Sequence, residues 1–232
     1  MLVAAACCPH PPLLVPEVAQ GAAGHLDAVR EACTVAVDSL LASGPEVVVI
    51  LGSGPAPGHW PTNTGGTLAG HGVDVRAGGT GPLVLPLPQT VGAWLLDRAG
   101  WTGPRAYVAV SPGQHPADAE PGLLAGPEGE RTGVLCMADG SAKRSPAAPG
   151  HLDARAEGHD AAVARAWAAG DAAALANLDA GLAAQLWVGG SPAWRALGTA
   201  ALARSSAPLM AVLLHESAPL GVGYLVATWT WP

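Results

Sequence analysis

Charged residues are scarce in this chain, and cations are the scarcest. Only 12% of the 232 residues are charged, and 11 lysines and arginines stand against 18 aspartates and glutamates, for a formal net charge of −7. Binding to nucleic acid requires clustered cations that neutralise phosphates. The composition therefore argues against a nucleic-acid partner.

Long hydrophobic runs are also absent. The longest apolar stretches, such as 47–51 and 208–214, are far shorter than the roughly 20 residues that cross a bilayer. The apolar start at 1–8 has no basic residues and continues into His10-Pro11-Pro12 rather than into a small-residue cleavage site, so it is predicted to be a strand. We expect no membrane partner and a cytoplasmic protein.

Cysteine is rare, and the common catalytic motifs are missing. Two of the four cysteines, Cys7 and Cys8, are adjacent on a predicted strand and would point to opposite faces, so reduced thiols are the simpler expectation. The chain has no G-x-S-x-G, dinucleotide-binding, C-x-x-C or H-E-x-x-H motif. The turn at 52–54 could present backbone amides to an anion, but it lacks the spacing and the lysine of a phosphate-binding loop.

What is present is an alternation of apolar strands and Ala-rich helices that fits one domain spanning residues 1–232. The order predicts an α/β fold with a mostly parallel central sheet flanked by helices, in which the first two strands form a parallel β-α-β unit. Residues 52–82, with an irregular hairpin around Val73 and Val75, and residues 111–130 are predicted to be loops. The predicted strands are 2–8, 47–51, 106–110, 134–137, 209–214 and 224–230; the predicted helices are 24–42, 91–99 and those within 153–203, with breaks at 170–171 and 189–192 and N-caps at Asp171 and Ser191.

Chemistry-bearing residues follow several of these strands. His10, Asp139 and Glu216 all come directly after an apolar run, and ligands of α/β proteins bind beyond the carboxyl ends of strands. The prolines on both sides of His10 fix its backbone. A carboxylate such as Glu216 is costly to bury unless it is paired or binds a metal. The alternatives are a structural histidine and a solvated strand-end carboxylate.

A polar cluster and a metal site are two further possibilities. Residues 139–144 hold Lys143 and Arg144 after a strand and could bind an anion, or could form an exposed turn. A catalytic metal site needs three protein ligands and an open position. His10 and Glu216 supply two, and His59 or His215 is the nearest third candidate, although His215 neighbours Glu216 on a strand and should point the other way.

Two segments carry a resemblance that covers nearly the whole chain. The opening run from Cys8 to Val18 and the closing run from His215 to Ala227 are similar to the ends of the class III extradiol dioxygenase subunit-B-like superfamily, which includes Memo-like proteins. In active members two histidines and a glutamate hold a non-haem ferrous ion, and another histidine acts as acid/base. The resemblance implies that His10 and Glu216 are metal ligands, with iron, zinc or manganese as the metal.

The chain departs from that family at two positions. The second metal-binding histidine of the family falls at Gly54, and its acid/base histidine falls at Ala142, within a segment that begins at Ala138-Asp139. Either His151 or Lys143 would have to replace the acid/base histidine. Losing a ligand weakens metal binding, and losing the proton carrier removes a factor of about 10² to 10⁴ in rate.

Three functions remain open from the sequence. The first is a non-haem metal-dependent dioxygenase on a small aromatic substrate, with a rearranged site of His10, Glu216 and His59. The second is a Memo-like binding or assembly protein without a metal. The third is a metal-free enzyme in which His10 is the base, Asp139 or Lys143 assists, and Lys143 or Arg144 binds an anionic substrate. We expect a small-molecule ligand in a cleft where His10 meets Glu216, and surface tryptophans such as Trp101 and Trp231 suggest a homo-oligomer.

Overall fold

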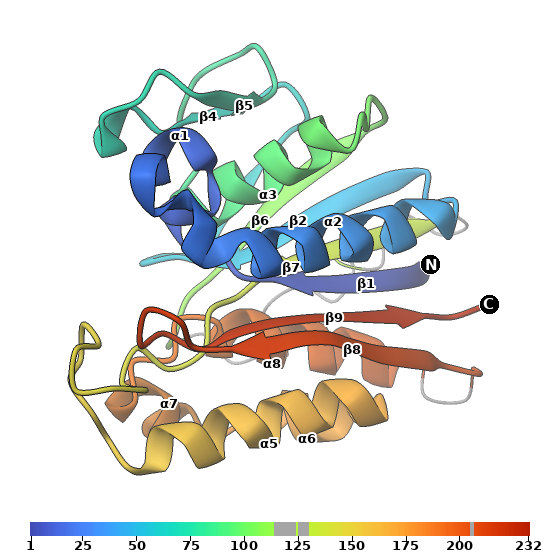
Figure 1. Cartoon of the computed structure of the whole chain (residues 1–232). Coiled ribbons are helices and arrows are strands. Elements are labelled where there is room, and N and C mark those ends of the chain that lie inside the picture. Colours follow the sequence, from blue (N-terminus) through green and yellow to red (C-terminus); the bar gives the residue numbers. More distant parts are fainter. Residues whose placement is uncertain (114–123, 125–129, 205–206) are drawn as a thin grey trace.

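A seven-stranded mixed sheet forms the centre of the computed structural model, which describes residues 1–113, 124, 130–204 and 207–232 (Figure 1). The order across the sheet is β3 (Gly58–Trp60), β6 (Arg105–Val110), β2 (Val47–Ser53), β7 (Thr132–Met137), β1 (Leu2–Cys8), β9 (Tyr224–Thr230) and β8 (Met210–Ser217). Strands β6, β2, β7 and β1 are parallel to one another, and β3 and β9 are antiparallel to their neighbours in this group. The predicted α/β class with a mostly parallel sheet is confirmed.

Helices cover both faces of the sheet (Figure 1). Because side chains alternate along a strand, Ala4, Ala6 and Cys8 pack under one helical layer while Ala5 and Cys7 pack under the other. The first layer contains α2 (Asp27–Ala42) and α3 (Leu87–Arg98), and the second contains α5 (Arg155–Ala169), α6 (Ala172–Ala176), α7 (Ala180–Gln185) and α8 (Ser191–Leu202). Shorter elements are α1 (Pro16–Ala19), the hairpin of β4 (Gly65–Thr67) and β5 (Arg76–Gly78), and 3₁₀ turns at Pro12–Leu14, Gln20–Leu26 and Ala69–His71.

Most predicted elements are found with small shifts, and several details were wrong. The strands at 2–8 and 224–230 match their predicted bounds. The first two strands are parallel, but β7 lies between them. Strand β8 extends to Ser217, so Glu216 lies inside the strand and not after it. The strand continues through these polar residues because it is an exposed edge strand, where polar side chains are tolerated. The predicted hairpin is found, with strands at 65–67 and 76–78; Val73 lies in the connection between them, and Val75 directly precedes the second strand. The predicted loop at 111–130 falls largely outside the described residues.

The helix caps were predicted in part. Asp171 caps α6, accepting a hydrogen bond from the Ala174 amide at 2.8 Å. Ser191 is the first residue of α8 and not its cap, a position that Gly190 occupies without a side-chain hydrogen bond. A third break, where Asp179 caps α7, is missing from the predicted elements, because its signal is a single aspartate in an alanine-rich run.

Tryptophans fill much of the core between the sheet and the second helical layer. The rings of Trp167 and Trp229 lie 4.6 Å apart, and the ring of Trp231 meets that of Trp229 edge-on at 6.1 Å. Trp231 is 5% exposed, so its predicted place on an oligomer surface was wrong. The large apolar area that these rings bury stabilises the packing of β9 and the residues that follow it.

All four cysteines are free and buried. The pKa of Cys8 is raised because its thiol interacts with Cys33 and is buried, and burial together with Cys7 raises the pKa of Cys136. Raised pKa values reduce the thiolate fraction, and the thiolate is the reactive form. We therefore expect a disulfide reagent such as DTNB at pH 8 to label none of the four thiols in the folded protein and all four in denaturant. Fast labelling of a thiol in the folded protein would contradict this packing.

Among the described residues, no helix has the length and apolar character needed to cross a membrane.

Candidate functional site

The carboxyl ends of four neighbouring strands bring the candidate residues into one row. Cys8, Met137, Gly52 and Ala109 are aligned across β1, β7, β2 and β6. Two residues further along the chain, just past the strand ends, come His10, Asp139, Gly54 and Ser111. Gly54, which aligns with the second histidine of the family that the sequence resembles, is thus at the same level as His10. We refer to these four residues as the edge row.

His10 and Asp139 are neighbours at one end of the edge row. The His10 backbone amide donates to Asp139 Oδ1 at 2.8 Å, and the imidazole Nδ1 lies 3.6 Å from the same oxygen. The two side chains are 13% and 18% exposed. Nδ1 is buried and makes no hydrogen bond. Nε2 is not fully buried, and it makes no hydrogen bond within the described part of the chain. The ring therefore faces the carboxylate with Nδ1 and solvent with Nε2.

Tyr224, the first residue of β9, adds a third polar side chain near Asp139. Burial and the negative charge of Asp139 raise the pKa of the Tyr224 phenol well above its ordinary value. Burial also raises the pKa of Tyr107, the only other tyrosine in the chain. Tyr224 is therefore a neutral hydroxyl at physiological pH.

We expect this pair of tyrosines to resist ionisation in the folded state. The folded pKa of each lies above the ordinary value of 10.0, so stability is unaffected below about pH 10 and falls as pH rises above it, where only the unfolded chain ionises. Absorbance at 295 nm during a pH titration measures this directly. In a Tyr107→Phe background, Asp139→Asn should lower the pKa of Tyr224, and an unchanged value would place the carboxylate away from the phenol.

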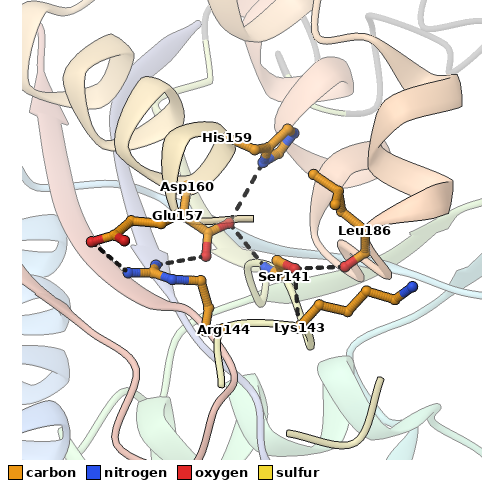
Figure 2. Close-up of polar contacts among 7 residues, drawn as sticks. All are labelled: Ser141, Lys143, Arg144, Glu157, His159, Asp160 and Leu186. Atoms are coloured by element: carbon orange, nitrogen blue, oxygen red, sulfur yellow. Dashed lines mark hydrogen bonds and ion pairs between the residues drawn. The ribbon is translucent and has the colours of Figure 1, made fainter. Parts of the chain in front are cut away.

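A buried ion pair holds the segment that carries Asp139 (Figure 2). Asp160 of α5 accepts hydrogen bonds from Arg144 Nη1 at 2.9 Å and from the Ser141 amide at 3.0 Å. The Asp160 and Arg144 side chains are 7% and 14% exposed. A Cβ added at Gly223 would overlap the Asp160 carboxylate, so only glycine fits where this turn meets α5. Arg144 is thus neutralised by Asp160 and is not free to bind a substrate anion.

Further bonds fix the same segment from three sides. The Ser141 hydroxyl donates to the Leu186 carbonyl at 2.6 Å, and the Gly190 amide donates to the Asp139 carbonyl at 2.7 Å. The Gly140 amide donates to the Gly223 carbonyl at 2.7 Å, which ties the segment to the turn between β8 and β9. Asp139 is therefore held on a rigid support, which acid/base chemistry requires.

The two proposed replacements for the acid/base histidine lie elsewhere. The Lys143 ammonium sits 5.4 Å from the centroid of the Trp187 ring, beside the end of α7. His151 is exposed, in a turn with a positive φ of 58°. Of the histidines in the described part of the chain, it is His10 that faces the Asp139 carboxylate.

The predicted metal ligands do not form one site. His59 lies on β3, four strands from β1, which is about 19 Å at the usual strand spacing of 4.7–4.9 Å.

The other two candidates lie on the edge strand β8. Glu216 is exposed and pairs with Leu225. Its side chain faces the α5–α8 layer, where it lines a small cavity with Arg144 and Asp160. His215 pairs with Val226 on the opposite face and contacts Ser217. Among the described residues no three His, Cys, Asp or Glu side chains are grouped to hold a metal.

The structure brings together His10 and Asp139, two residues that the sequence predicts for the site, and adds Tyr224 and Asp160, which the sequence does not predict. Both missed residues act through contacts between distant segments, and neither belongs to a local motif. No protein-family model matches the chain, and no curated protein matches it.

Proposed function

We propose that this chain is an extradiol-dioxygenase-like α/β protein that binds a small molecule at the edge row and acts on it by proton transfer through His10, without a metal. The observation that carries the proposal is the His10–Asp139 geometry, with Nδ1 3.6 Å from the carboxylate and Nε2 open to solvent. A histidine held in this way is the usual general acid/base of enzymes.

Each residue has a distinct part in this chemistry. Nε2 of His10 takes a proton from the bound molecule, and the imidazolium that forms is stabilised by the negative charge of Asp139. Asp139 is a positioning residue, because it acts on the substrate only through His10. The Tyr224 hydroxyl near Asp139 is neutral, so it adds no charge of its own to the site. The returning proton leaves Nε2 for the product or for water, which restores the neutral ring.

The resemblance to the extradiol superfamily supports the scaffold and the place of the site, because His10 and the Gly54 position share the edge row. The separation of His10, His59 and Glu216 across the sheet argues against the three-ligand metal route. The departures at Gly54 and Ala142 remove the family's second metal-binding histidine and its acid/base histidine, and they leave His10 with Asp139 as the remaining pair.

Solvent exchange tests the proposal with simple probes in place of a natural substrate. Small carbonyl compounds, namely pyruvate, acetone and acetylacetone, are incubated with the protein in D₂O with a chelator, and loss of the C–H signals beside the carbonyl is followed by NMR. We expect protein-dependent exchange of at least one probe, with His10→Gln reducing the protein-dependent rate by about 10²-fold or more. His59→Gln is the matched control and should exchange at the wild-type rate.

The other two functions give different results in the same experiment. A metal-dependent enzyme would lose activity with the chelator and with His59→Gln or Glu216→Ala, and would contain near-stoichiometric metal. A binding or assembly protein would show no exchange above background with any probe and no difference between wild type and His10→Gln. Either result would overturn the proposal.

A further inference from the structure

A second cavity lies between α7, α8 and the turn that joins them, with Pro112 also in its lining. Its volume is about 270 Å³, slightly below the roughly 300–1,000 Å³ of typical small-molecule sites. The walls are mostly apolar, with alanines from α7 together with Val188 and Pro192. Trp187 and Arg195, which have unusual properties, also line it, together with Gly189 and Ser191.

Trp187 occupies a backbone position that normally belongs to glycine. It follows the C-cap of α7, its φ is +54°, and its amide donates to the Ala184 carbonyl at 3.2 Å. The Val188 amide donates to the Ala183 carbonyl at 2.9 Å, which completes the two-bond Schellman arrangement at this helix end. Glycine adopts this conformation without the strain that a side chain introduces. The tryptophan is therefore unfavourable for the turn.

The same tryptophan gains little from burial. Its side chain is 56% exposed, whereas Trp167, Trp194 and Trp229 are fully buried. A large, exposed ring on a strained backbone beside a cavity is typical of a binding surface and not of a folding element. The Lys143 ammonium, 5.4 Å from the ring centroid, stacks on this ring.

The Arg195 guanidinium carries a positive charge and has no anionic partner among the described residues. In the described part of the chain, its guanidinium makes no ion pair or hydrogen bond, and its Nε is buried. Arg195 lies near the start of α8, and side chains on a helix point back toward its positive N-terminal end, where a cation is unfavourable. Lys143 adds a second cation at the Trp187 ring. One cation in the lining of a largely apolar cavity matches a ligand that has one negative group and an apolar body.

We propose that this cavity binds a small carboxylate with a compact apolar body, with Arg195 as its counter-ion and the Trp187 ring as one wall. Guanidinium groups pair with carboxylates through two parallel hydrogen bonds, and the alanine-rich wall contacts the rest of the ligand. The inference goes beyond the proton transfer proposed for His10 and does not depend on it.

Calorimetric titration of the full chain with benzoate tests this site, with the neutral benzamide and inorganic phosphate as comparison probes. Benzoate should bind saturably, and benzamide and phosphate should each bind about ten-fold more weakly or less. Arg195→Gln should weaken benzoate binding about ten-fold or more. Arg204→Gln is the matched control, because its Nε is also buried and unbonded but it lines a different cavity; it should change the affinity less than two-fold.

Trp187→Gly separates binding from folding, and it decides the question even if Arg195→Gln fails to fold. Removing strain should leave the midpoint of thermal unfolding unchanged or raise it, while benzoate binding weakens several-fold. The proposal would be overturned by a lower midpoint with unchanged binding, by equal affinities of wild type and Arg195→Gln, by phosphate binding more tightly than benzoate, or by no saturable benzoate binding.

Discussion

Asp160→Ala should lower the free energy of unfolding by about 3–5 kcal/mol, the largest stability effect that we expect from one side chain. The substitution leaves the guanidinium of Arg144, which is 14% exposed, without the partner that lies 2.9 Å away. It also removes the acceptor of the Ser141 amide, a buried donor. For a chain of this size the expected change in melting temperature is roughly 10 °C.

Urea unfolding measures this effect, and two further variants assign its cause. Asp74→Ala is the matched control, because Asp74 also pairs with an arginine but is 84% exposed; it should change stability by less than about 0.5 kcal/mol. Joint replacement of Asp160 by Leu and Arg144 by Met should recover much of the loss, since a well-packed apolar pair can replace a buried ion pair. A small effect of Asp160→Ala would show that the pair does not hold the segment.

Asp139→Asn should reduce the exchange activity by about 10²–10⁴-fold while the protein stays folded. The amide oxygen can still accept the hydrogen bond from the His10 backbone, which Asp139 Oδ1 now accepts at 2.8 Å, so the loop keeps its main contact. The amide has no negative charge to stabilise the imidazolium. The loss therefore comes from the missing charge and not from a change in structure.

The unfolding midpoint distinguishes this role from a structural one. It should stay within a few degrees of wild type in Asp139→Asn while the exchange rate falls. A variant that loses activity only because it unfolds, or a folded variant that keeps the wild-type rate, would show that the charge of Asp139 has no part in the chemistry.

The sequence predicts the scaffold well because its signals are local. Buried parallel strands appear as short apolar runs, and the run at 47–51 lies in a strand near the middle of the sheet. Parallel strands end at a common edge, so the strand pattern alone is enough to place His10 and Asp139 together. The edge strand β8 is the exception, because its polar end at His215 and Glu216 gives no local sign that the strand continues.

The rest of the site depends on pairings that no local pattern contains. The contact of Asp160 with Arg144 joins α5 to a loop, and Tyr224 lies close enough to feel the charge of Asp139 because β9 lies beside β1. The order of strands also separates His59 from His10, a distance that sequence spacing does not show. Trp187 gives no signal in the sequence, because its positive φ and its exposure are visible only in three dimensions.

The most direct test of a metal-free acid/base site is a ¹⁵N NMR measurement of the His10 ring, with the assignment made by comparison with His10→Gln. We predict that neutral His10 carries its proton on Nδ1, which faces the Asp139 carboxylate, and has a free Nε2, and that added zinc leaves both signals unchanged. A ring with its proton on Nε2, or a ring whose Nε2 signal moves on stoichiometric zinc binding, would contradict a metal-free acid/base site at the edge row.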